Sequence, residues 1–215
     1  MKKLSFFVLA ALVASFTLSA QVPPVDLNKQ PSKLAVKEAK KYKKDKWLVA
    51  PGKLPLEFQL DQSYTLQLTK DENNYDLYIW GEGISVGQTY DAAKMQALEV
   101  AKMQLASKLK SQVASIVDNT VGNEQLPREQ AESIAKTIAA SKTLIPQQDL
   151  ERLMSVVELY RELPKKNKEV LVHVFYNREK AMAAAKRAIG EQLVRDGLAK
   201  EGKELHEKLD KLLGY

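Results

Sequence analysis

The stretch YIWGEGISVGQTYDAAKMQALEVAKMQLASKL, residues 78–109, decides the fold of this chain. It begins inside a run rich in β-formers, residues 75–86, which predicts a strand. Thr89 can cap the helix that follows. Small or apolar side chains then recur every four residues, namely Ala93, Ala97, Ala101, Leu105 and Leu109. Alanines on this stripe let the helix lie close to a sheet.

Two further strands and two further helices are expected downstream. Residues 153–163 and 169–176 are typical of strands, and the turn PKKNK between them predicts a hairpin. A helix is expected from Pro127 to about residue 144, and Asn177 can cap a final helix. The order strand, helix, helix, strand, strand, helix predicts an α+β fold. Its sheet would be small, antiparallel and three-stranded, with long helices packed on one face.

Residues 54–68, which precede the first strand, fit two patterns. Their leucines alternate with other residues as in a strand. Leu56, Leu60 and Tyr64 also recur at helical spacing, and Pro55 suits a first helical turn. We favour the helix.

The first 20 residues have the order of a secretory signal peptide. Lys2 and Lys3 precede an apolar run, residues 4–18, and the small pair Ser19-Ala20 follows. Because the run is too short for a good membrane-spanning helix, we expect cleavage near Ala20; an uncleaved anchor is the alternative. We then expect the protein in the periplasm or at the outer membrane.

The positive charge is concentrated in an N-terminal arm, residues 21–53. The net charge is +6, but this arm holds nine lysines against three acids, and residues 54–215 hold 22 basic against 24 acidic side chains. Its spacing permits a short amphipathic helix ending near Trp47. We expect it to bind an anionic membrane or wall polymer; the alternative is a solvated tether. The candidate residues are Lys33, Lys37, Lys40, Lys41, Lys43, Lys44 and Lys46.

The quoted stretch resembles the core of the membrane-associated twenty-kilodalton lipoprotein family of bacterial envelopes. The later segment MSVVELYRELPKKNKEVLVHVFYNREKA, residues 154–181, fits the hairpin and final helix of that domain. A similar domain is found in a flagellar assembly protein of the periplasm. The resemblance covers residues 75–189 and implies that residues 54–215 form an α+β envelope domain, with a C-terminal helix extension and without established enzymatic activity.

This chain departs from the lipoproteins of that family because it has no cysteine. We therefore expect no lipid anchor on a cysteine of its own. The same absence excludes disulfides and a catalytic thiol.

Motifs for cofactor and metal chemistry are weak. The glycines Gly81, Gly83 and Gly87 form G-x-G-x-x-x-G, not the dinucleotide fingerprint, and better suit a close helix–strand contact. His173 and His206 are distant from each other and lack zinc-binding partners, and no G-x-S-x-G presents a nucleophilic serine. We expect no cofactor and no metal. The expected export and the nearly neutral body argue against nucleic acid as a partner.

Paired carboxylates are the basis of one alternative function. Glu158 with Glu162 or Glu82 could serve a periplasmic hydrolase acting on a sugar or peptide bond. The simpler interpretation is that these glutamates are solvated acids on strands.

The sheet face opposite the helices is the better candidate for a partner site. If Leu77 and Ile79 face the helices, Tyr78 and Trp80 face away, because side chains alternate along a strand. By the same argument, inward Val157 and Leu159 would turn Glu158 and Tyr160 outward, and the third strand could add His173 and Phe175. The candidate partner-binding residues are Tyr78, Trp80, Glu158, Tyr160, His173 and Phe175. The alternative is that residues 54–68 cover this face.

We therefore expect an exported, non-enzymatic envelope protein that works by binding or scaffolding. The lysine arm would contact an anionic surface. The aromatic face or the C-terminal helix, with its leucines between 198 and 212, would contact a protein partner or a second copy.

Overall fold

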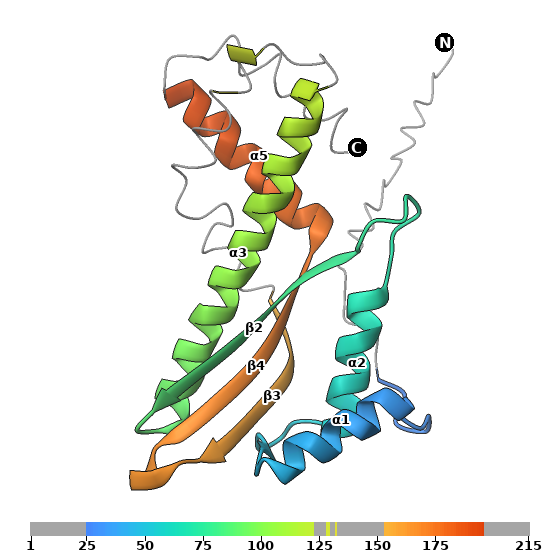
Figure 1. Cartoon of the computed structure of the whole chain (residues 1–215), viewed down its shortest axis with the longest axis vertical. Helices are drawn as coiled ribbons and strands as arrows, with labels where there is room; N and C mark the ends of the chain where they lie inside the picture. The colour runs from blue at the N-terminus through green and yellow to red at the C-terminus, as the bar shows by residue number, and fades with distance from the viewer. Residues whose placement is uncertain (1–24, 123–127, 130–131, 133–152, 196–215) are drawn as a thin grey trace, which may run out of the picture.

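The computed structural model describes residues 25–122, 128–129, 132 and 153–195 (Figure 1). These residues form an α+β fold with four helices and one antiparallel sheet of four strands. The elements in chain order are α1 (Lys33–Lys44), β1 (Leu48–Val49), α2 (Leu56–Leu68), β2 (Tyr78–Gly87), α3 (Tyr90–Gly122), β3 (Met154–Glu162), η2 (Pro164–Lys166), β4 (Lys168–Asn177) and α5 (Arg178–Arg195).

The sheet has the strand order β1-β3-β4-β2, so the prediction of three strands is wrong. The additional strand is β1, which pairs Leu48 with Tyr160 and Val49 with Leu159 on β3. Two residues are too few to show a strand periodicity in the sequence. The hairpin of β3 and β4 and the strand β2 are confirmed, and β2 pairs with β4 along its whole length.

Helices cover both faces of the sheet, and the prediction that they pack on one face is wrong. Figure 1 shows α3 on one side of the sheet, with α2 and α1 on the other. On the α3 face the core contains valines of β4 and the alanines of α3. On the opposite face, Leu56, Leu60 and Leu66 of α2 are buried against the sheet. The helical interpretation of residues 54–68 is therefore confirmed.

The backbones of α3 and β2 are in direct contact, as the small residues predict. A Cβ atom added to Gly83 would lie 1.8 Å from the carbonyl oxygen of Ala97, and one added to Gly81 would lie 2.4 Å from that of Ala101. No side chain larger than hydrogen fits at either glycine. The stripe from Ala93 to Leu109 is completely buried, and the Thr89 hydroxyl accepts the N–H of Ala92 as the expected cap.

The N-terminal arm packs against the rest of the fold from α1 onward. The predicted short helix is confirmed as α1, whose Ala35 and Ala39 are buried together with Trp47 in the core beneath α2. Ser32 caps the helix through its hydroxyl. Residues 33–50 are therefore not a solvated tether.

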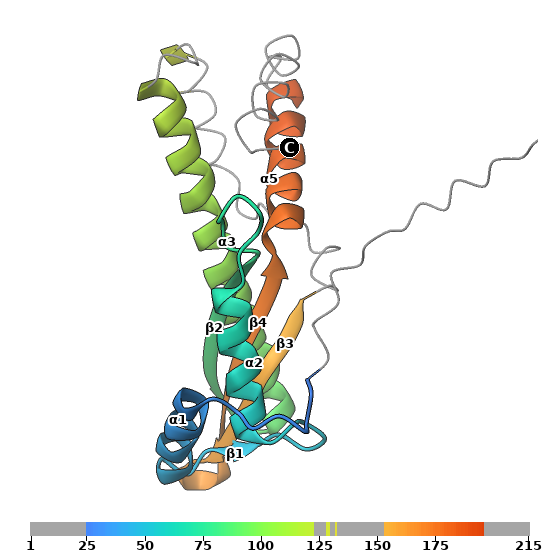
Figure 2. The ribbon, with the colours of Figure 1, turned by 90° about the vertical axis from the view of Figure 1, so that its right-hand side faces the viewer.

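The last described helix, α5, begins at the predicted cap, because the Asn177 side chain accepts the N–H of Lys180. Beyond the end of the sheet, α5 runs beside α3 (Figure 2). The predicted signal peptide, most of the helix expected at residues 127–144, His206 and the C-terminal leucines lie outside the described residues. Within the described part of the chain, no helix is long and apolar enough to cross a membrane.

We predict that Gly83→Ala destabilises the fold by about 3 kcal/mol, because the new methyl group must push α3 away from β2. The free energy of unfolding in denaturant measures the effect. Ser85→Ala, on the same strand face, is the control and removes only a side-chain hydrogen bond to Gln96. Equal losses for the two variants would contradict a backbone contact at Gly83.

Candidate functional site

The exposed face of α1 is the most distinctive charged surface among the described residues. Five lysines recur at spacings of three and four residues and so share one side of the helix, opposite the buried Ala35 and Ala39. We call them the lysine face: Lys33, Lys37, Lys40, Lys41 and Lys44. All five are exposed, and none makes an ion pair with another described residue.

The other two predicted lysines lie apart from this face. Lys43 is bound to Glu57 of α2, with 2.5 Å between the ammonium and the carboxylate. Lys46 follows the helix in a turn, where its φ angle is 64°. Exposed Leu34 stands at the border of the lysine face, three residues before Lys37 and seven before Lys41.

Contacts with α2 hold the lysine face outward. The Tyr64 hydroxyl donates to the Glu38 carboxylate, and the backbone N–H of Ser32 donates to Asp61. Burial, followed by the nearby Glu82 and Glu38 carboxylates, raises the pKa of Tyr42 on α1 to about 12. The inner side of α1 is thus fully engaged with the fold, which leaves the lysines as its solvent side.

The predicted aromatic patch is not exposed. Tyr78, Trp80, His173 and Phe175 do share one sheet face, and the Trp80 ring lies 6.2 Å from the Phe175 ring and 5.6 Å from the His173 ring. However, α2 covers this face, and Tyr78, His173 and Phe175 are buried. Of the two arrangements that the sequence allowed, the structure has the covered one.

Glu158 and Tyr160 lie on the opposite face, which corrects the predicted grouping. Val157 and Leu159 do point into a core, but it is the core beneath α2. Their neighbours Glu158 and Tyr160 therefore face α3, because side chains alternate. Leu77, expected on the α3 side, also packs against the core beneath α2, and only Ile79 lies as predicted.

Glu158 is a buried carboxylate with three cationic or hydroxyl neighbours. Only 2% of it is exposed. Its side chain accepts the Tyr90 hydroxyl and lies 2.6 Å from the Lys94 ammonium and 3.0 Å from that of Lys53. Burial by itself would raise the pKa of this carboxyl, but the bonds from Lys94, Tyr90 and Lys53 outweigh it and hold the pKa below 4.5. The group ties β3 to α3 and to the loop before α2.

A polar chain that the sequence did not predict crosses the other face. The Ser63 hydroxyl lies 3.2 Å from Nδ1 of His173, whose Nε2 lies 2.9 Å from the Glu82 carboxylate. The bond to His173 lowers the pKa of Glu82. No local motif links these residues, because Ser63 and His173 are 110 positions apart.

Ser63, His173 and Glu82 are the residue types of a catalytic triad, but the serine is not accessible to a substrate. Ser63 is 1% exposed, lies on the sheet side of α2, and accepts a further hydrogen bond from Gln67. A nucleophile must reach its substrate. The hydrogen bonds among these three side chains instead link α2 to β4 and β2.

The three candidate glutamates do not form a pair. Glu82 lies on the face beneath α2, and Glu158 lies on the α3 face. Glu162 is exposed near the hairpin turn, where it pairs with Lys168. No two of them share a cleft, so these residues give no support to the hydrolase alternative. Within the described ranges, no group of three or more acidic or histidine side chains could hold a metal ion.

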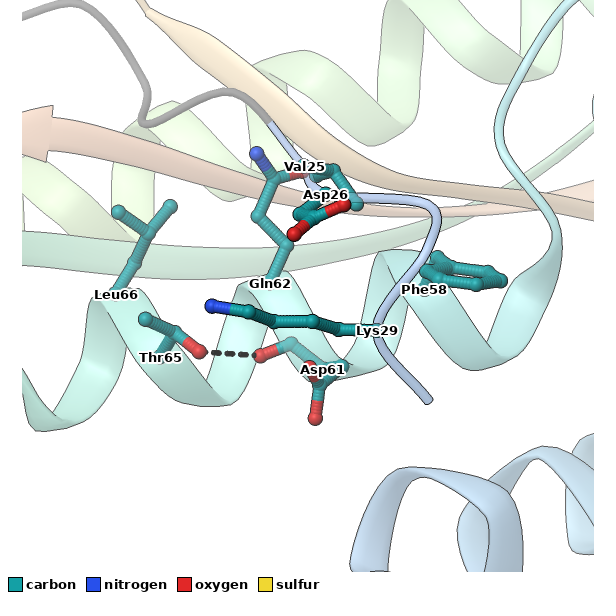
Figure 3. A pocket seen from close by; sticks show the side chains of 8 residues that line it. All are labelled: Val25, Asp26, Lys29, Phe58, Asp61, Gln62, Thr65 and Leu66. Carbon is teal, nitrogen blue, oxygen red and sulfur yellow. Dashed lines mark hydrogen bonds between the residues drawn. The ribbon is translucent and has the colours of Figure 1, made fainter. Parts of the chain in front are cut away.

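A shallow cavity of about 230 Å³ lies between α2 and the chain that precedes α1 (Figure 3). Its lining carries both charge signs, with Lys29 beside two aspartates, and the Thr65 hydroxyl donates to the Asp61 carbonyl. This mixture selects no class of ligand. The lining residues are Val25, Asp26, Lys29, Phe58, Asp61, Gln62, Thr65 and Leu66.

No family model matches this chain, and searches of curated proteins and of solved structures also found no match. The resemblance to the envelope lipoprotein family therefore stays a prediction.

We predict that Glu158→Gln lowers the free energy of unfolding by about 2 kcal/mol at neutral pH. Breaking a fully buried ion pair costs about 3–5 kcal/mol, and the two lysines here are one-third exposed, which reduces the loss. Because the folded pKa of Glu158 is depressed, its contribution exists above pH 4.5 and disappears as the pH falls further.

Denaturant titrations from neutral to acidic pH measure both effects. The variant should approach the wild type in stability as the pH falls below about 4.5. Glu162→Gln, on the same strand and exposed, is the matched control and should change stability far less. A constant gap between Glu158→Gln and wild type at every pH would show that the lost contribution is not the charge.

Proposed function

We propose that this protein is an exported, non-enzymatic component of a bacterial envelope that binds an anionic membrane through the lysine face of α1. The observation that carries the proposal is the five exposed lysines on one side of a helix whose other side is fixed to the fold. Adjacent cations on a rigid support act together on a charged surface.

The electrostatic attraction of these lysines to anionic lipid is strong enough for peripheral attachment to a membrane. Each lysine held near an anionic lipid surface contributes about 1 kcal/mol at moderate salt. These five side chains, which form no ion pair with another described residue, keep their charge available for lipid headgroups. Residues 54–215 have an almost balanced charge, so the net positive charge lies in the N-terminal arm that contains the lysine face.

An exposed leucine favours lipid over a wall polymer. Leu34 is 57% exposed and lies beside Lys37 and Lys41. An apolar side chain among lysines can enter the boundary between headgroups and acyl chains, whereas a polyanionic polymer offers it nothing apolar. This combination is typical of helices that lie on membranes.

The non-enzymatic part of the proposal is supported by the arrangement of the polar groups. Glu82 and Glu158 lie on opposite faces of the sheet, Glu162 is exposed near the hairpin turn, and Ser63 is enclosed beneath α2. The predicted signal peptide and the family resemblance support export. Scaffolding of a protein partner by the aromatic face would require α2 to leave the sheet, so we assign the membrane contact to α1 instead.

We predict that Lys37→Gln combined with Lys41→Gln weakens binding to anionic vesicles about 30-fold, which corresponds to about 2 kcal/mol. Co-sedimentation with phosphatidylglycerol-containing vesicles at low salt measures the partition. Raising the salt should weaken binding of the wild type more than of the double variant, because fewer charges remain to be screened.

The matched control is Lys102→Gln combined with Lys110→Gln, which removes the same charge from α3 on the other side of the sheet. Its binding should stay close to that of the wild type. Equal weakening in both double variants would assign the attraction to net charge and not to α1. Retention on purified wall polymer, with no binding to vesicles, would replace the membrane by the polymer.

A further inference from the structure

Three lysines have a backbone conformation that favours glycine. Lys46, Lys165 and Lys166 each have a φ angle of 64°. In the part of the chain that the structure describes, Asn74 is the one other non-glycine residue with a positive φ. Asparagine tolerates this conformation, whereas lysine has no short polar side chain that would stabilise it. Backbone strain of this kind is typical of functional positions.

Two of these lysines form the tip of the turn between β3 and β4. Lys165 and Lys166 stand between Pro164 and Asn167, and both lysines are exposed. Where two consecutive residues of a hairpin turn have positive φ, Asn-Gly is the preferred pair. This turn has two lysines in their place, so it is less stable than the same turn with Asn-Gly would be.

The acidic side chains beside this turn are already neutralised. Glu162 and Glu169 form ion pairs with other basic residues of the same hairpin. Neither Lys165 nor Lys166 forms an ion pair with another described residue. The tip of the turn therefore carries two positive charges that are available to a partner, although residues 54–215 are nearly neutral as a whole.

Arg161, at the base of this hairpin, connects it to the end of α1. The Arg161 guanidinium lies 4.7 Å from the centre of the Trp47 ring and donates to the carbonyl of Asp45 at 3.3 Å. The same side chain lies 2.5 Å from the Glu169 carboxylate on β4. Exposed Lys46 lies between Asp45 and Trp47 in the sequence. Because Trp47 is buried beneath α2, these contacts fix the hairpin relative to α1.

Figures 1 and 2 show α1 and the β3–β4 turn at the same end of the long axis of the molecule, whereas α3 and α5 extend toward the opposite end. Exposed groups at one end of an elongated molecule can touch one flat surface together. Cations that are engaged by one surface at the same time add their contributions to the binding free energy.

We propose that the β3–β4 turn is a second contact with the anionic membrane, made by Lys165 and Lys166 together with Lys46. This inference rests on the proposed membrane contact of α1 and adds an orientation to it. The end of the molecule that holds α1 and the turn faces the lipid headgroups, and α3 and α5 point away. The lysine ammonium groups bind lipid phosphates as point charges, and a lipid surface is wide enough to engage both contacts at once.

Lys165→Asn combined with Lys166→Gly, called the turn variant, separates binding from stability. We expect it to bind phosphatidylglycerol-containing vesicles about 30-fold more weakly than the wild type at low salt, because two cations near the surface are removed. We also expect its thermal unfolding midpoint to rise by about 3 °C, because Asn-Gly suits the turn. A lower midpoint together with weaker binding would assign these lysines to the fold and overturn the proposal.

Two further double variants make the outcome specific. Lys102→Gln with Lys110→Gln removes the same charge from α3, and an equal loss of binding there would overturn the second contact. Lys37→Gln with Lys41→Gln reports on α1 alone. If this α1 variant binds weakly and the turn variant binds like the wild type, the second contact is overturned and the proposed function stands. If the turn variant alone binds weakly, the contact of α1 is overturned and that of the turn stands.

A fluorescent label tests the orientation, because the chain has no cysteine of its own. We expect a polarity-sensitive nitrobenzoxadiazole label on Pro164→Cys, at the turn, to shift its emission to shorter wavelengths when phosphatidylglycerol vesicles are added. The same label on Ser111→Cys, exposed in the second half of α3, should not shift. A shift at both positions, at Ser111→Cys alone, or at neither position on vesicles that bind the protein would overturn the orientation.

Discussion

The contact between the backbones of α3 and β2 is the constraint on which the other contacts depend. Because Gly81 and Gly83 have no side chains, the backbone of α3 at Ala97 and Ala101 lies directly on the strand. This closeness lets Gln104 and Lys108 reach around the strand edge. β2 is the last strand of the sheet, β4 lies between β2 and β3, and α2 packs on the opposite face.

The second face is stabilised differently, by a mixed apolar and polar contact. The leucines of α2 bury apolar surface against the sheet. The hydrogen bonds of Ser63, His173 and Glu82 fix the position of the helix, because hydrogen bonds are directional. The α1 helix is then positioned by α2, through Tyr64 and Glu38. The orientation of the lysine face therefore depends on the contacts between α1 and α2 and, through α2, on the sheet.

The spacing of neighbouring residues predicted most of the helices and strands. Contacts between residues far apart in the sequence decided the features that this spacing could not predict. The alanine stripe of α3, the hairpin and the caps at Thr89 and Asn177 were predictable because each pattern lies within a few neighbouring residues. Strand β1 was not, because its two residues form a strand only by pairing with β3. The facing of Glu158 was missed for a related reason: alternation shows which side chains share a face but not which core that face meets. The lysine face was visible in the sequence as a charge cluster, and the structure reduced seven candidates to five.

The pairing of β1 with β3 has a consequence for the order of folding. Leu48 pairs with Tyr160, 112 positions later, so strand β1 forms only when the distant strand β3 is present. Closing so long a loop is entropically costly and slow compared with helix formation. During synthesis α1 and α2 can meet early, but the sheet they cover does not exist until β3 and β4 have been made. The lysine helix is thus among the first segments to emerge and among the last to reach its final place.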